Sequence, residues 1–158
     1  MRYYETVRSP LSASNAVKKL ADFEKVSQWD HSVKSCVARK ETLSASREPC
    51  EGTTYDVVVD FLGSDVPIEY KIIHLSEKAV TLKGVGENSV TIDEMVCVDI
   101  PGIGCELQYN ATISIAFPYW LVDCYLKCLF QQTVDEAIAG LRVFLSSEPY
   151  TNPMTPTN

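Results

Sequence analysis

His74 and Glu94 have the chemistry of a general acid or base, and each falls within a strand-like segment. In each segment they share the alternate spacing of the apolar residues, which predicts that both lie on the buried face of a sheet. A buried carboxylate or imidazole is costly unless it is paired or hydrogen-bonded. One interpretation is that the two groups lie near strand ends, or meet a tyrosine hydroxyl, and satisfy one another. The other is that both face a bound small molecule.

Other patterns that carry catalysis or bind metals are missing from the sequence. It has no nucleophile elbow, no glycine-rich phosphate loop and no cluster of His and Cys at metal-ligand spacing. His31 is the only other histidine and follows Trp29-Asp30 in an expected turn. Cys124 and Cys128 lie one helical turn apart and could share a metal ion, but no second pair of ligands accompanies them. We therefore expect buried thiols, no metal and no cofactor.

The composition is that of an acidic globular chain. Hydrophobic residues make up 46% of its 158 residues, charged residues 22%, and the formal net charge is -7. This charge argues against nucleic acid as a partner. The longest apolar run, 115–122, is far too short to span a membrane. Because no signal peptide precedes the first strand-like segment, we expect a cytoplasmic protein whose six cysteines are free thiols.

The expected elements follow the order strand, two short helices, six strands and one long helix. Ser12 suits the N-cap of a helix over Ala13–Ala21, and a second short helix is expected from Asp22 to Gln28. The strands are expected at 2–8, 33–42, 53–61, 67–75, 79–85, 89–100 and 105–116, and the long helix at 119–145. Pro101-Gly102-Ile103-Gly104 is expected to form the turn between the last two strands. Residues 1–147 are expected to form one domain, and 148–158 a disordered tail.

With this order of elements the chain resembles the SRPBCC superfamily of START-like, helix-grip proteins, and within it the polyketide cyclase/dehydrase and lipid-transport branch. The residues that carry the resemblance are Ser12-Ala13-Ser14-Asn15-Ala16-Val17, Leu20-Ala21-Asp22-Phe23, Gln28-Trp29-Asp30, Val33 and Gly52. Lys18 departs from the family, since many members carry an aromatic residue there. The resemblance implies an α+β helix-grip fold: a seven-stranded antiparallel sheet curled around a long C-terminal helix, with two short helices after the first strand and a cavity between sheet and helix.

Alternation along the strands assigns the residues that would line this cavity. The expected ligand-binding residues are Tyr55, Val57, Val59, Phe61, Tyr70, Ile72, His74, Leu82, Glu94, Val96, Leu107, Tyr109, Ile113, Trp120 and Cys124. Phe23, Val26 and Trp29 fall three residues apart and share one helical face, so they are expected to form a lid over the cavity.

Three functions are compatible with this pattern. The first is binding of a hydrophobic small molecule (a lipid, an isoprenoid or a polycyclic, polyketide-like compound), as a carrier or sensor. The second is a cofactor-independent polyketide cyclase, aromatase or dehydratase that uses Glu94 or His74 as its acid or base. The third, suggested by the chaperone-activator branch of the same superfamily, is a protein-interaction module.

The first part of the expected terminal helix, 117–130, is apolar on almost every side. Only Asp123 and Lys127 interrupt it, and their spacing places them on one narrow stripe. Such a helix is either buried between the sheet and the loops or touches a second surface. In the second case Tyr119 and Trp120 would make a transient contact with a membrane or a protein.

Overall fold

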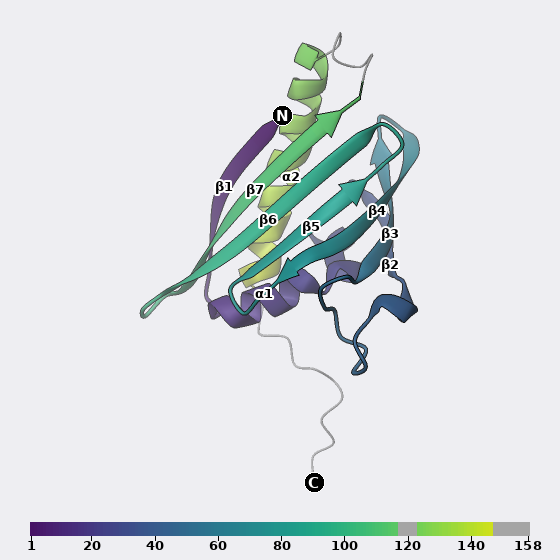
Figure 1. Cartoon of the computed structure of the whole chain (residues 1–158). Coiled ribbons are helices and arrows are strands. Elements are labelled where there is room, and N and C mark those ends of the chain that lie inside the picture. Colours follow the sequence, from purple (N-terminus) through teal and green to yellow (C-terminus); the bar gives the residue numbers. More distant parts are fainter. Residues whose placement is uncertain (117–122, 147–158) are drawn as a thin grey trace.

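A curved antiparallel sheet and one long helix make up most of the molecule. The computed structural model describes residues 1–116 and 123–146, with side chains for 1–116 and 131–146. The strands are β1 (Arg2–Ser9), β2 (Val33–Ala38), β3 (Thr54–Phe61), β4 (Ser64–Leu75), β5 (Ala79–Val85), β6 (Ser89–Ile100) and β7 (Gly104–Ile115). They form one seven-stranded sheet in the order β1-β7-β6-β5-β4-β3-β2. The sheet curls around helix α2 (Asp123–Ser146), as predicted (Figure 1).

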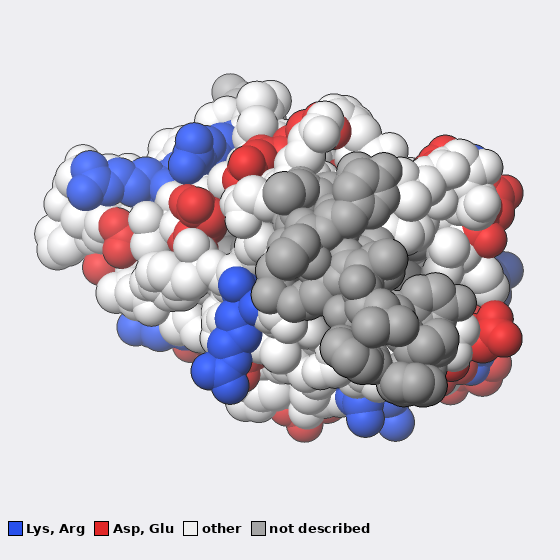
Figure 2. Space-filling view, turned by 90° about the horizontal axis from the view of Figure 1, so that it is seen from above, with Lys and Arg blue, Asp and Glu red and all other residues white. Residues whose placement is uncertain are grey.

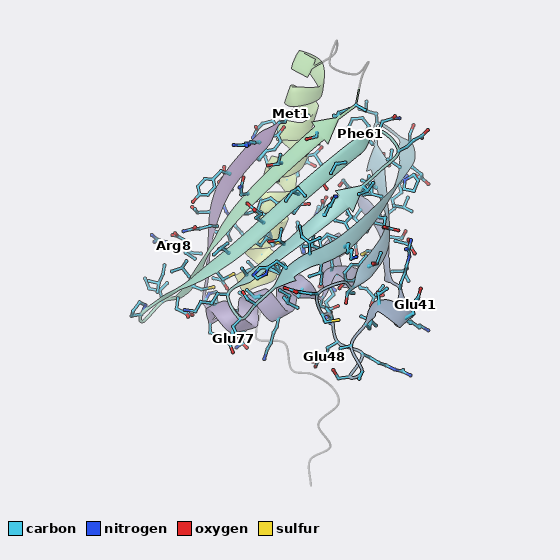
Figure 3. All side chains as sticks on the ribbon, viewed as in Figure 1. Met1, Arg8, Glu41, Glu48, Phe61 and Glu77 are labelled. Carbon is cyan, nitrogen blue, oxygen red and sulfur yellow. The ribbon has the colours of Figure 1, made fainter. Side chains whose placement is uncertain are left out.

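The two ends of the sheet are distinguished by the elements that cover them. Met1 and Phe61 lie at the upper end as drawn, and Arg8 and Glu77 at the lower end (Figure 3). Helix α1 (Ala13–Ala21) crosses the lower end, and α2 runs from the upper toward the lower end behind the sheet (Figure 1). Seen from the upper end, the described surface carries acidic and basic side chains interspersed, with no continuous basic area on that face (Figure 2).

Helix α1 forms where capping and apolar spacing agree. The Ser12 hydroxyl accepts a hydrogen bond from the backbone N–H of Asn15 at 3.3 Å, which caps the helix start. Ala13, Ala16, Val17 and Leu20 recur on one face and are buried to 2% exposure or less. The predicted second helix is a 3-10 helix, η1 (Phe23–Gln28), which lies against β2.

The C-terminal end of α2 is fixed by side chains from the start of the chain. The hydroxyl of Ser9 donates to the carbonyl oxygen of Leu145 at 2.7 Å, and the ammonium group of Lys19 donates to that of Phe144 at 2.6 Å. These are carbonyls of the last helical turn, which a helix leaves without an internal partner. Desolvation lowers the pKa of Lys19, and the nearby charge of Lys25 acts in the same direction.

The element bounds differ from the prediction in a few places. β2 ends at Ala38 rather than near Thr42, because the 3-10 helix η2 (Lys40–Thr42) follows it. β4 begins three residues before Pro67. The predicted tail at 148–158 and the predicted contact through Tyr119 and Trp120 lie outside the described residues. No helix in the described ranges is long and apolar enough to cross a membrane.

Candidate functional site

The concave face of the sheet has a packed lower half and a less covered upper half. In the lower half, Ile72, Leu82, Met95 and Leu107 are 1% exposed or less and pack with α1 and the C-terminal part of α2. The upper half carries half-buried side chains, namely Val59, Phe61, Val66, Ile68, Thr91, Ile113 and Ile115. Most of these are apolar and keep accessible surface, so the upper half is where a small molecule could bury apolar area.

A polar cluster lies at the middle of the concave face, between the two halves. It consists of Tyr70 on β4, Thr91 and Asp93 on β6, and Tyr109 on β7. The Tyr109 hydroxyl donates to Asp93 Oδ1 at 2.7 Å, and the Thr91 hydroxyl donates to the Tyr70 hydroxyl oxygen at 3.2 Å. The Tyr70 hydroxyl lies beside the Asp93 carboxylate and acts to lower its pKa. Three strands therefore bring their polar groups to one carboxylate.

Gly84 on β5 makes room for this cluster. Tyr70 lies directly opposite Gly84 in the register of β4 and β5, and Gly84 lies opposite Thr91 in that of β5 and β6. A Cβ atom at Gly84 would lie 2.4 Å from Thr91 Oγ1 and 2.7 Å from Tyr70 Cζ. The ring of Tyr70 can cross β5 and reach β6 only because that side chain is missing.

Burial sets the protonation of Asp93. Desolvation raises its pKa from 3.8 to about 6, while the hydrogen bond from Tyr109 and the nearby hydroxyls of Tyr70 and Thr91 act in the opposite direction. The negative charge of Asp30 contributes to the rise. Among the described residues no Lys or Arg forms an ion pair with Asp93 or Asp30. The site thus holds a carboxyl group that can change protonation near neutral pH.

Asp30 follows η1 and borders the cluster. Its Oδ1 accepts from the backbone N–H and the hydroxyl of Ser32, at 3.0 and 2.6 Å. Desolvation raises the pKa of Asp30. The same residue's charge also acts on the pKa values of Tyr70 and Tyr109, both of which desolvation raises above the ordinary tyrosine range.

The predicted lid residues form a wall that is fixed on both sides. Phe23, Val26 and Trp29 are buried, at 6%, 1% and 6% exposure. The Phe23 ring lies 5.2 Å from the ring of Tyr70, centroid to centroid. On the other side α2 rests on the backbone of Trp29, where a Cβ at Gly140 would come within 2.1 Å of the Trp29 carbonyl oxygen. Whether these residues act as a lid stays a prediction.

Most of the predicted ligand-binding residues lie on the concave face. Tyr55, Val57, Val59, Phe61, Tyr70, Ile72, Leu82, Leu107, Tyr109 and Ile113 are all there. Tyr55, Val57, Ile72, Leu82 and Leu107 are fully buried in the packed core, so they have little surface left for a ligand. Trp120 and Cys124 lie outside the residues whose side chains are described.

The placement of Glu94 and Val96 on the concave face is wrong. Both are exposed on the convex face, where Glu94 accepts a hydrogen bond from the Asn110 side chain. The reason is the turn: Ile100 pairs with Gly104, so the loop has three residues rather than the four that the sequence suggested. A shift of one residue exchanges the two faces of a strand. Asp93 therefore takes the inward position that Glu94 was expected to hold.

The placement of His74 on the concave face is also wrong. A bulge in β4 between Ile72 and His74 turns the side chain of His74 outward and that of Leu75 inward. Glu51 supports the bulge, because its Oε1 accepts from the Leu75 backbone N–H at 3.0 Å and lies 3.2 Å from His74 Nδ1. His74 is therefore part of a surface interaction and not of the concave site.

Other features could mark a different kind of site. In the described part of the chain no group of three or more His, Cys, Asp or Glu side chains could hold a metal ion. A groove of about 530 Å³ lies beside the β6–β7 turn, lined by residues 99–104 with Pro10 and Ser12. It is open to solvent and is lined mainly by residues of the turn and its flanks, so it encloses a small molecule less well than the concave face would.

Comparison with known proteins shows the fold. No protein-family model matches the sequence, and no curated protein matches it. A START superfamily protein from Mycobacterium smegmatis has a similar structure, with a TM-score of 0.72 at 16% identity over 91% of this chain and 96% of that chain. The ZhuI aromatase/cyclase from Streptomyces sp. R1128 has a TM-score of 0.69 at 9% identity, covering 92% of this chain and 90% of that one. One half of the di-domain aromatase/cyclase StfQ, from the steffimycin pathway, is also similar (TM-score 0.67, 13% identity, 91% of this chain and 50% of that chain).

The chain therefore has the START-like, helix-grip fold of the SRPBCC superfamily. At these identities the likeness concerns the fold alone, and the side chains of the concave face have to supply any argument about function.

Proposed function

We propose that the protein binds an apolar small molecule on the upper half of the concave face, as a carrier or sensor. The observation that supports this is the arrangement of half-buried apolar side chains around one buried polar cluster. Sites for small molecules usually combine a mostly apolar lining with a few convergent polar groups. A lipid, an isoprenoid or a polycyclic compound would suit such a lining.

The apolar lining can supply most of the affinity. Burial of apolar surface contributes about 25 cal/mol per Å², so a ligand that buries about 200 Å² gains about 5 kcal/mol before the entropic cost of binding. Tyr70 and Tyr109 would add contact with their rings and would orient the ligand through the cluster.

Two measurements test this proposal. Native mass spectrometry of protein purified from its own source should show a retained apolar molecule. In vitro, Ile113→Trp fills the upper half and should weaken binding of a fluorescent apolar probe about tenfold or more. The matched control is Ile73→Trp, because Ile73 is 46% exposed on the convex face. Equal affinity of the two variants would contradict the proposed position of the ligand.

A second candidate is cofactor-independent cyclisation or dehydration, now with Asp93 as the acid or base. The observation in its favour is a carboxyl group with a pKa of about 6 beside two tyrosine hydroxyls in a half-covered site. Two proteins of similar structure are aromatase/cyclases by name. The test is turnover of a linear poly-β-ketone without added cofactor. Asp93→Asn should abolish turnover, while Glu94→Gln should retain it; turnover by Asp93→Asn at the wild-type rate would remove Asp93 from the mechanism.

A further inference from the structure

Two hydroxyl protons of the cluster are donated within the cluster. Thr91 donates to Tyr70, and Tyr109 donates to Asp93 at 2.7 Å. A tyrosine hydroxyl has one proton, so Tyr109 has none left for a ligand once it donates to Asp93. The ionised Asp93 carboxylate and the Tyr109 oxygen keep free lone pairs. These two groups can accept hydrogen bonds from a ligand, but neither has a proton to give.

From this geometry we infer that the ligand presents a hydrogen-bond donor, a hydroxyl or a protonated amine, to Asp93 and Tyr109, and that a ketone or a carboxylate is disfavoured there. The inference rests on the proposed binding of a small molecule at this site. It adds the chemistry of the ligand's polar end, which an apolar lining alone does not specify.

The hydroxyl protons are not easily redirected to a ligand. If Tyr109 turned its proton toward a ketone, Asp93 would lose its shortest hydrogen bond. An ionised buried carboxylate that loses a partner bears the full cost of desolvation, which exceeds the gain from one neutral hydrogen bond. Gly84 and Phe23 pack against the Tyr70 ring and hold its hydroxyl near Thr91 and Asp93.

The negative charges near the cluster also disfavour a carboxylate ligand. Asp93 is 9% exposed and Asp30 is half-buried, and no described Lys or Arg pairs with either of them. A carboxylate ligand would bring a third negative charge to this region, whereas an ammonium group would bring a compensating one. The amine should therefore bind at least as tightly as the alcohol.

The test uses naphthalene carrying one of five groups: ethyl, acetyl, hydroxyethyl, aminoethyl or carboxymethyl. Isothermal titration calorimetry on the full chain, at a pH well above the pKa of Asp93, gives the dissociation constant of each compound. The dissociation constant of the hydroxyethyl compound should be about tenfold or more below that of the acetyl compound. The reason is that the alcohol can donate a hydrogen bond to Asp93 or Tyr109 and the ketone cannot. The aminoethyl compound should match or exceed the alcohol, and the carboxymethyl compound should bind most weakly.

Two variants connect this preference to the cluster. Asp93→Asn offers an amide that both donates and accepts, so the ratio between alcohol and ketone should fall toward one. Glu94→Gln is the matched control, since Glu94 is the next residue on the same strand and lies on the exposed convex face. It should keep the wild-type ratio. The wild-type series needs neither variant to fold.

The outcomes separate the inference from the proposed function. If the ketone binds as tightly as the alcohol to the wild-type protein, the inference is overturned while binding at the concave face stands. A preference that survives in Asp93→Asn overturns it as well, because the preference then arises elsewhere. If none of the five compounds binds, the proposed function itself fails and the inference fails with it.

Discussion

The carboxyl group of Asp93 couples the stability of the protein to pH. Because burial raises its pKa from 3.8 to about 6, the folded state binds this proton more tightly than the unfolded state does. This contribution to the free energy of unfolding is complete at a pH below the pKa of Asp93 in the unfolded chain. It is lost as the pH rises through about 6 and amounts to about 3 kcal/mol. The groups that face Asp93 are Asp30, Tyr70 and Tyr109, and the raised pKa of Asp30 acts in the same direction.

Asp93→Asn should remove this part of the pH dependence. At neutral pH we expect the variant to be more stable than the wild type by about 1 to 3 kcal/mol, since a neutral amide replaces a buried charge. Urea unfolding on both sides of the window between the two pKa values measures the difference. Glu94→Gln should unfold with the pH dependence of the wild type. A wild-type pH dependence in Asp93→Asn as well would show that another group is responsible.

Gly84→Ala tests the packing that positions Tyr70. The added Cβ would meet Thr91 Oγ1 and the Tyr70 ring at 2.4 and 2.7 Å, so the ring must move. We expect a loss of about 1 to 3 kcal/mol in the free energy of unfolding. In the background of Tyr70→Ala, where the ring is missing, the same substitution should cost much less. Additive costs in this double-mutant cycle would mean that Gly84 does not act through Tyr70.

At the scale of elements, the contact between α2 and the segment after η1 depends on Gly140. Alanine normally stabilises a helix interior by about 1 kcal/mol relative to glycine. At Gly140 its Cβ would lie 2.1 Å from the Trp29 carbonyl oxygen, a backbone atom that cannot move by itself. We therefore expect Gly140→Ala to destabilise the protein by about 1 to 3 kcal/mol, measured by urea unfolding.

The neighbouring residue provides the control for this prediction. Ala139 is exposed on the same turn of α2, so Ala139→Gly should show the ordinary helix preference and cost about 1 kcal/mol. A Gly140→Ala variant more stable than the wild type would contradict the close approach of α2 to Trp29.

The elements were largely predictable from the sequence, because periodicity and capping act over short distances. The bounds of α1, β5 and β6 agree with the prediction to the residue. The faces of β6 were not predictable in this way, since Val90, Ile92, Val96 and Val98 make its convex side look more apolar than its buried side. One residue in the length of the β6–β7 turn decided between the two assignments.

For the candidate site, the sequence predicted the inward-facing side chains whose position follows from the pattern of their own strand. It missed those whose position follows from the pairing with a neighbouring strand. Tyr70 and Tyr109 were predicted, because each follows the apolar alternation of its own strand. Asp93 and Thr91 were missed, since their inward position follows from the pairing of β6 with β7. Gly84 was the one available signal: a glycine inside a strand often marks a close approach by another group.

At the scale of the whole molecule, the sheet separates a packed interior from an exposed convex face that is also partly apolar. Met95 and Val96 are adjacent on β6 but are 1% and 39% exposed. Met95→Thr should lower the free energy of unfolding by about 2 to 4 kcal/mol, and Val96→Thr should change it by about 0.5 kcal/mol or less. Similar costs for both substitutions would indicate that the convex face of β6 is covered by a partner.

The order of strands in the sheet has a consequence for how the chain folds. From β2 to β7 each strand pairs with its neighbour in sequence, and from β3 onward the turns between them are short, so this meander can form step by step. β1 instead pairs with β7, and Val7 lies opposite Leu107, about a hundred residues away. During synthesis β1 therefore has no partner strand until β7 has been made. We expect its insertion beside β7, together with the docking of α2 on Ser9 and Lys19, to complete folding.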